Sequence, residues 1–372
     1  GQEAWSISVV VGLSLRHDVV SSGSQRKFAM KVCSFLAFAL ILFAQGASAQ
    51  PLVHQSQPGG RITAQSGIPV PTSDQTAITT LFYAPYEGRP PYVPIYNGVS
   101  IASVQFTASI ADAVGLSLTL NTSAQTSGNL YDIYVGNNSG LQLCTGPAWS
   151  NSGAGTSSRG AAADIALVLG IQVNAAQITC NFGSSSFTCP AKQCTRLGTM
   201  LATANGQTAL QFRPAAASGG ANPIVGFCNA YNQVAVRSAQ NDSTSTWTYN
   251  SLTVRDANNS SNNRIRYVDC NGDVRPLFTY AITATSAAGP GPAANATVGV
   301  CFNVDCATLG TFSGATQWAN STSSSEGGPA LGSASPDPVL GLNFGQAGEM
   351  ANTSATTTFY GGTMELSLNT KM

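Results

Sequence analysis

Short stretches in which apolar and polar residues alternate recur along most of the chain. A half-buried strand requires this period of two, because successive side chains point to opposite faces of a sheet. Clusters of Gly, Asn and Ser, such as residues 136–140 and 258–263, separate the stretches and favour turns. The stretches that we expect to form strands are 80–84, 101–107, 116–120, 130–135, 233–236, 246–249, 339–344 and 356–368.

Long helical periods are missing from this pattern. Residues 161–173 are the one candidate helix, although Gly170 weakens it. Regular strand-and-turn spacing predicts an all-β protein, with an antiparallel β-sandwich or jelly-roll-like fold. We expect one β-rich domain over residues 78–372 with a Ser/Gly/Pro-rich loop at 321–338; two packed halves that meet near 193–206 are the alternative.

Residues 30–49 have the organisation of a signal peptide. A Met-Lys pair precedes an apolar run at 32–44, which suits a signal-peptide core and is shorter than the roughly 20 residues of a membrane-spanning helix. An Ala-Ser-Ala sequence then predicts cleavage between Ala49 and Gln50. We therefore interpret residues 1–29 as an upstream extension and expect an exported protein, secreted or at the cell surface, without a membrane anchor after cleavage.

Residues 50–77 are rich in Pro, Gly, Ser and Gln and show no period. Such a composition predicts a flexible arm. A flexible arm can reach a neighbouring subunit without disturbing the folded body, so we expect this segment to connect subunits in a homo-oligomer.

Charged residues make up only 9% of the chain, against roughly a quarter in ordinary soluble domains. Lys and Arg (16) balance Asp and Glu (16), so no basic field attracts nucleic acid or anionic lipid. The 43% of hydrophobic residues argues against disorder. Large uncharged surfaces favour packing against other copies, and this supports the expected self-association.

Histidine occurs twice, as His17 and His54, and only His54 follows the predicted cleavage site. It lies in the Pro/Gly-rich arm, away from any expected core element. Ser-His-Asp or Cys-His catalysis therefore lacks a base, and a histidine-built metal site is excluded. We expect no catalytic residues, no cofactor and no metal.

One of the nine cysteines lies in the predicted signal peptide, which leaves an even number in the exported chain. This predicts up to four disulfides whose connectivity the sequence leaves open. Three alternative pairs would each close a short loop: Cys189 with Cys194, Cys301 with Cys306, and Cys180 with Cys189. The equal spacing of the first two pairs makes a four-thiolate zinc site the alternative. The disulfide candidates are Cys144, Cys180, Cys189, Cys194, Cys228, Cys270, Cys301 and Cys306.

Two carboxylates in a groove with an aromatic floor would make a glycosidase, which needs no histidine. Nothing in the spacing of the acidic residues distinguishes such a pair from surface acids, and the tryptophans are equally well explained as core aromatics. The candidate acids are Asp132, Asp164, Asp256 and Glu349, and the candidate sugar platforms are Trp149, Trp247 and Trp318.

Residues 269–273 (Asp-Cys-Asn-Gly-Asp) place oxygen ligands at alternate positions, as the start of a calcium loop does. The glycine falls two positions early for a helix-loop-helix site, and no helices are expected beside it. Asn-Gly between β-prone segments is a hairpin signal by itself. We favour a turn over a calcium site.

A set of short motifs runs in order along the chain: FYAPY (82–86), PIYNG (94–98), LYDIY (130–134), TGPAW (145–149), SRG (158–160), GIQVN (170–174), LGT (197–199), NAYN (229–232), WTYN (247–250) and TTTFYGG (356–362). This set resembles a family of bacteriophage and prophage virion proteins of the tail-fibre or capsid-decoration type.

The resemblance spans about residues 78–372 and implies a structural role without active residues. A signal peptide and this many cysteines depart from that family, and they suggest a copy adapted to an exported, oxidising setting. We expect a non-catalytic structural or adhesive surface protein; the alternative is a carbohydrate-binding module or glycosidase that engages a surface glycan.

Overall fold

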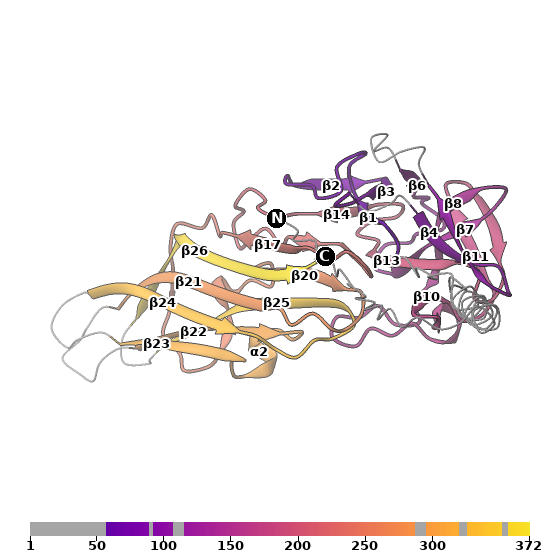
Figure 1. Cartoon of the computed structure of the whole chain (residues 1–372). Helices are drawn as coiled ribbons and strands as arrows, with labels where there is room; N and C mark the ends of the chain where they lie inside the picture. The colour runs from indigo at the N-terminus through magenta and orange to yellow at the C-terminus, as the bar shows by residue number, and fades with distance from the viewer. Residues whose placement is uncertain (1–56, 89–91, 107–114, 287–294, 320–325, 352–355) are drawn as a thin grey trace, which may run out of the picture. The chain divides into compact units, whose positions relative to one another are not determined.

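The computed structural model describes residues 57–88, 92–106, 115–286, 295–319, 326–351 and 356–372. The predicted upstream extension, signal peptide and cleavage site lie outside these residues, as does His54. Residues 55–372 cluster as one unit, and its described part is almost entirely β (Figure 1). Helical structure in that part is limited to η2 (Ala161–Ala163), η3 (Ala257–Asn259) and α2 (Cys306–Leu309).

The first half of the described chain builds three antiparallel sheets (Figure 1). The largest runs β12 (Ser185–Cys189), β11 (Ile178–Phe182), β8 (Leu141–Ala148), β7 (Leu130–Asn137), β13 (Thr195–Leu201), β10 (Ile171–Asn174) and β9 (Ile165–Val168), with β16 (Phe227–Asn229) also paired to β13. A second contains β1 (Gly60–Thr63), β3 (Thr80–Pro85) and β6 (Leu116–Thr119), and a third contains β4 (Tyr92–Tyr96) and β5 (Ile101–Gln105).

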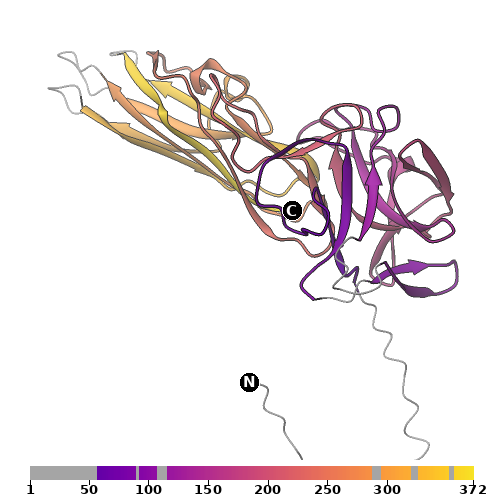
Figure 2. The same cartoon turned by 90° about the horizontal axis from the view of Figure 1, so that it is seen from above.

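The second half, joined by β2 from the first half, forms two longer sheets that pack face to face (Figures 1 and 2). One runs β2 (Gln75–Ile78), β14 (Thr208–Leu210), β15 (Ile224–Val225), β20 (Arg264–Asp269), β25 (Gly341–Ala351), β22 (Asn295–Phe302) and β23 (Gly314–Ala319), with β19 (Arg255–Asp256) on β25. The other runs β17 (Ala235–Gln240), β26 (Thr357–Lys371), β21 (Leu277–Ser286) and β24 (Glu326–Ala334), with β18 (Trp247–Tyr249) on β26. Pairing is antiparallel except between β15 and β20.

Alternation along β21 shows why these sheets pack as a sandwich. Phe278, Tyr280 and Ile282 are buried and point to one face, where they share a core with Tyr267 of β20 and Leu366 of β26. Burial of large apolar side chains from both sheets is the main favourable term in such a fold. The all-β sandwich predicted from the alternation is confirmed.

The two sheets of the sandwich approach closely where β24 crosses β22. A Cβ added to Gly332 would lie 2.7 Å from the Cα of Gly299 and 2.9 Å from the carbonyl oxygen of Val298. Only glycine leaves room for backbone against backbone at this distance.

We expect Gly332→Ala to lower the free energy of unfolding by about 1–3 kcal/mol, because the methyl group forces the sheets apart. Urea unfolding followed by tryptophan fluorescence measures the change. Gly362→Ala is the control: its Cβ meets nothing within 4 Å, so the effect should stay within about 0.5 kcal/mol. Equal stability of the two variants would contradict the close sheet contact.

The predicted helix at 161–173 is wrong. After the single turn η2, the segment forms the β9–β10 hairpin, in which Val168 pairs with Ile171 across a two-residue turn. Leu169 and Gly170 both have positive φ (50° and 84°). Two-residue hairpin turns need this geometry, so the glycine that weakened the helix instead permits the turn.

The flexible arm predicted for residues 50–77 is also wrong where the structure describes it. Residues 60–63 form β1, which pairs with β3 and is buried at every position. Arg61 donates hydrogen bonds to the carbonyl oxygens of Pro69 and Met372. Turn-forming Pro and Gly residues therefore connect packed strands here; residues 50–56 of the predicted arm lie outside the described residues.

One predicted boundary, that of the loop at 321–338, differs from the structure. Residues 193–206 include β13, which lies between β7 and β10 in the middle of its sheet, and the next strand, β14, belongs to another sheet within the same unit. The loop predicted at 321–338 contains β24 from Glu326 onward, paired along its length with β21; residues 321–325 lie outside the described part. Gly and Ser in this segment reflect the tight approach of the two sheets rather than a loop.

Candidate functional site

The eight candidate cysteines form four disulfides. Cys189 is bonded to Cys194 and Cys301 to Cys306, each pair five residues apart in sequence, which selects two of the short loops that the sequence left open. The remaining bridges are Cys144–Cys180 and Cys228–Cys270, so the alternative of Cys180 with Cys189 is wrong. Disulfides of this number are typical of proteins outside the reducing cytoplasm.

The zinc alternative required the two short-spaced pairs to share one ion. Each pair is instead closed on itself as a disulfide. Within the described segments, no group of three or more His, Cys, Asp or Glu side chains is placed to hold a metal ion.

Asp132 and Trp149, proposed above as catalytic acid and sugar platform, meet inside the protein. The indole N–H of Trp149 donates to Asp132 Oδ2 over 3.1 Å, and Trp149 is only 4% exposed. Asp132 also pairs with Arg159 and Arg196, each through Nε at 2.7 Å. The Arg159 guanidinium stacks 4.3 Å from the centroid of the Trp149 ring.

This first charged cluster connects the large N-terminal sheet to the end of β20. Arg159 and Arg196 both donate to the carbonyl oxygen of Cys270, at 3.1 and 2.8 Å. Burial alone would raise the pKa of Asp132, but Arg196 and Arg159 outweigh it and hold that pKa below its usual value. Asp132 therefore stays ionised as a structural anion, because every lone pair it offers is directed at a donor of the scaffold.

Glu349 and Trp247 form a second cluster of the same kind in the sandwich. Trp247 of β18 donates its indole N–H to Glu349 Oε2 over 2.7 Å, which joins the two facing sheets. Arg255 contacts the other carboxylate oxygen at 2.7 Å and lies 3.7 Å from the centroid of the Tyr249 ring. Trp247 is 9% exposed and Glu349 is fully buried.

Burial raises the pKa of Glu349 to about 7, despite the opposing effects of Arg255 and Trp247. Between about pH 4.5, the usual pKa of this side chain, and pH 7, the folded protein then holds a proton at Glu349 that the unfolded chain has lost. Stability from this group is consequently present at low pH and is lost as the pH rises through this range.

We expect Glu349→Gln to remove this pH dependence. As the pH rises from 4.5 to about 8, the free energy of unfolding of the variant should increase by up to about 3 kcal/mol relative to that of wild type. A pKa that moves from 4.5 to about 7 corresponds to that amount. Urea unfolding at both pH values measures the difference. Glu365→Gln on the surface of β26 is the control and should stay within about 1 kcal/mol of wild type. A constant difference between Glu349→Gln and wild type would contradict the raised pKa.

The other glycosidase candidates do not complete a catalytic pair with these acids. Asp256 is next to Arg255 on β19 and so points to the opposite sheet face from Glu349, where its Oδ1 accepts the N–H of Cys306 over 2.8 Å. Asp164 is exposed and accepts the N–H of Ile165. The side chain of Trp318 is outside those that the structure describes.

The carboxylate of Asp269 organises the 269–273 segment as a turn. It accepts backbone N–H groups from Asn271, Gly272 and Val274 at 2.9–3.2 Å. The turn is confirmed, but the hairpin is not, because β20 and β21 belong to different sheets. The Asp269 oxygens that a calcium ion would need are committed to the backbone.

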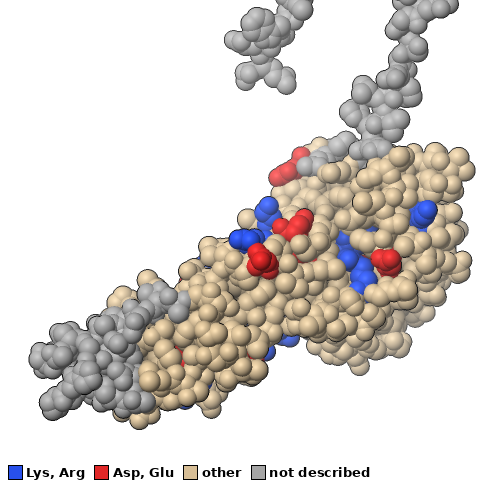
Figure 3. Space-filling model, turned by 90° about the horizontal axis from the view of Figure 1, so that it is seen from below, with Lys and Arg blue, Asp and Glu red and all other residues tan. Residues whose placement is uncertain are grey.

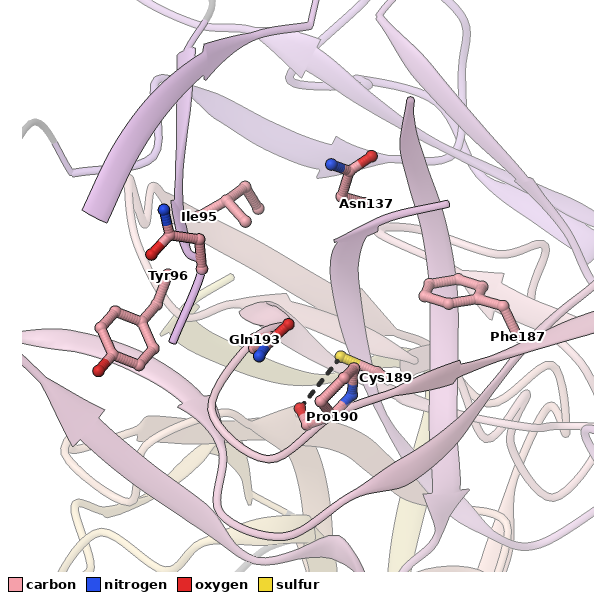
Figure 4. A pocket seen from close by; sticks show the side chains of 8 residues that line it. Ile95, Tyr96, Asn137, Phe187, Cys189, Pro190 and Gln193 are labelled. Carbon is pink, nitrogen blue, oxygen red and sulfur yellow. Dashed lines mark hydrogen bonds between the residues drawn. The ribbon is translucent and has the colours of Figure 1, made fainter. Parts of the chain in front are cut away.

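A small pocket of about 110 Å³ lies beside the Cys189–Cys194 loop (Figure 4). Sequence reasoning missed it because its walls come from segments far apart along the chain. The available signals were the aromatic residue before an Asn-Gly turn in PIYNG and the short cysteine loop. The lining residues are Ile95, Tyr96, Asn97, Asn137, Phe187, Cys189, Pro190 and Gln193.

Charged side chains are sparse on the surface. Figure 3 shows one face on which a few groups of Lys, Arg, Asp and Glu side chains lie on a mainly uncharged surface. Exposed charged side chains of the protein pair locally, as Arg237 does with Glu365 and Arg275 does with Asp337. No helix in the described ranges has the length and apolar character to cross a membrane.

No protein family model and no curated protein matches the chain. Dimeric latent PorU from Porphyromonas gingivalis aligns with 66% of this chain and 22% of its own, at a TM-score of 0.23 and 8% identity. The functional form of the mosquito-larvicidal Cry4Aa toxin from Bacillus thuringiensis aligns with 83% of this chain and 57% of its own, at a TM-score of 0.19 and 8% identity. The chain thus spans less than two thirds of either structure, and similarities this weak carry no argument about function.

Proposed function

We propose that this protein is a non-catalytic, exported structural or adhesive component of a surface. The observation that carries the proposal is that the two tryptophan–carboxylate clusters are buried and hydrogen-bonded within the protein. Asp132 with Trp149 and Glu349 with Trp247 were the best candidates for sugar chemistry, and both pairs are buried and saturated by scaffold donors. The hydrogen bonds and ion pairs of these two clusters stabilise the fold.

Export is supported by the four disulfides and by the predicted signal peptide at residues 30–49. A rigid, cross-linked β scaffold with few charges suits a protein that must persist outside the cell. The resemblance to virion fibre and decoration proteins adds an assembly-forming character to the proposal.

Self-association belongs to the same proposal. Deleting the whole predicted arm, residues 50–77, would not test it, because the deletion removes β1 and most of β2, which pair with β3 and β14, and would damage the fold itself. The sharper comparison is residues 50–372 against residues 57–372 by light scattering at micromolar concentration. A stable oligomer formed by both versions supports assembly through the folded body, whereas monomers in both would contradict it.

Enzymatic activity is tested with a panel of glycans incubated with the exported chain. We expect no hydrolysis, because the candidate acids are held by arginine and tryptophan side chains. Turnover of any glycan that is abolished by Glu349→Gln would overturn the non-catalytic role. Binding without turnover favours the adhesive form of the proposal.

A further inference from the structure

The pocket beside the Cys189–Cys194 loop has a fixed frame. The loop is closed by its disulfide, and Asn174 ties both ends: Nδ2 donates to the carbonyl oxygen of Pro190, and Oδ1 accepts the N–H of Cys194, each over 2.8 Å. Thr195 holds β4 in place through a hydrogen bond to the carbonyl oxygen of Pro94. A preformed site of this kind loses little freedom when a ligand binds.

Three primary amides border the pocket with unused donor capacity. Asn97 Oδ1 accepts the N–H groups of Val99 and Ser100, and Asn137 Oδ1 accepts that of Gly140. Among the described residues, neither Nδ2 group has a hydrogen-bond partner, and the Gln193 side-chain amide has none either. The carbonyl groups thus fix the turns, while the NH2 groups remain available to a ligand.

The rest of the lining is apolar or aromatic. Figure 4 shows Tyr96 and Phe187 on opposite sides of the pocket, with Gln193 and the Cys189–Pro190 turn between them. No Lys, Arg, Asp or Glu lines the pocket. An ionic ligand would therefore find no counter-charge, and a wholly apolar ligand would leave the amide groups unpaired.

We propose that this pocket binds one terminal neutral sugar residue, a hexose or an N-acetylhexosamine, of a surface glycan. The ring presents an apolar C–H face to Phe187 and Pro190, and its hydroxyl oxygens accept from the amides of Asn97, Asn137 and Gln193. A volume of about 110 Å³ leaves no room for a second ring, which limits the proposed ligand to one sugar residue. This inference rests on the adhesive form of the proposed function and supplies its ligand class.

A second hollow on the same half of the protein provides a comparison. It is lined by hydroxyl and amide groups, including Asn121, Asn181 and Ser186, and it has no aromatic side chain. Because it offers no apolar face for a sugar ring, it serves as the control surface.

The test combines a neutral glycan array with titration of galactose, glucose, mannose and N-acetylglucosamine, followed by ligand-observed NMR. We expect millimolar binding of at least one monosaccharide by the wild-type protein. Gln193→Leu keeps the side-chain size and removes the amide, and Asn137→Asp keeps the Oδ1 that fixes its turn. Each should weaken binding at least about tenfold, since a polar group of the ligand is left unpaired.

Ser186→Ala in the second hollow should bind as wild type does, and unchanged thermal midpoints of all three variants exclude misfolding as the cause. Absence of monosaccharide binding, or binding that Gln193→Leu and Asn137→Asp leave unchanged, would overturn the sugar site. Those results leave the structural role intact, whereas glycan hydrolysis would instead overturn the proposed non-catalytic function.

Discussion

Asp132→Asn should be among the most damaging single substitutions in this protein, with a loss of about 3–5 kcal/mol in the free energy of unfolding. The amide keeps the shape of the carboxylate but removes the charge that compensates Arg196, which is fully buried, and Arg159, which is 10% exposed. An uncompensated buried guanidinium costs more than the net value of the ion pair. Thermal unfolding should therefore shift downward by roughly 10 °C.

The control for this variant is Asp273→Asn, which makes the same chemical change at an exposed position. It should stay within about 0.5 kcal/mol of wild type. If both variants unfold at the same denaturant concentration, Asp132 is not the anion on which the two arginines depend. If the wild-type protein hydrolyses a glycan and Asp132→Asn abolishes that activity, the assignment of this cluster to the scaffold is also wrong.

Local alternation predicted eight strand segments, and each of them overlaps one of the 26 strands in the described residues. Residues 80–84, 116–120 and 130–135 form β3, β6 and β7 with ends that differ by no more than two residues. β3 and β6 alternate between more and less buried positions because one side faces the core, whereas β7 is buried on both faces from Leu130 to Gly136. The all-β class followed from many such segments and did not depend on any one of them.

Errors arose where tertiary packing decides the conformation. Residues 60–63 look like a loop because Gly60 and the nearby prolines signal turns, yet β3 and the backbone partners of Arg61 hold them as a buried strand. Residues 165–174 are apolar in a way that fits a helix or a hairpin, and only the pairing with β13 selects the hairpin. Short apolar runs carry this ambiguity by nature.

The candidate acids show that the sequence alone could not distinguish a catalytic acid from a structural one. The residues Asp132, Arg159 and Arg196 are 27 to 64 positions apart, and no spacing rule brings them together. A buried carboxylate with two arginines and an exposed catalytic acid have the same sequence signature, because each is one acid in a β-prone segment. Only the fold shows which donors surround it.

The four disulfides should contribute different amounts to the free energy of unfolding, and Cys228–Cys270 should contribute the most. It joins β16 to the end of β20 across 42 residues, next to the carbonyl oxygen on which Arg159 and Arg196 converge. Loop-closure entropy predicts that a cross-link of this span stabilises by about 4 kcal/mol, against about 2 kcal/mol for a five-residue span. Replacing both cysteines of the pair with alanine should therefore cost about twice as much as the same replacement at Cys301 and Cys306.

Urea unfolding of the two double-alanine variants measures this difference, with the Cys301 and Cys306 variant as the matched control of equal chemistry. Both pairs are buried, so loss of apolar contacts is similar and the loop length is the main variable. The Cys228 and Cys270 variant should also lose cooperativity, because the bridge and the Asp132 cluster together attach the N-terminal sheet to β20. Equal destabilisation of the two variants would show that local packing, rather than the constraint on the unfolded chain, sets the contribution of each bridge.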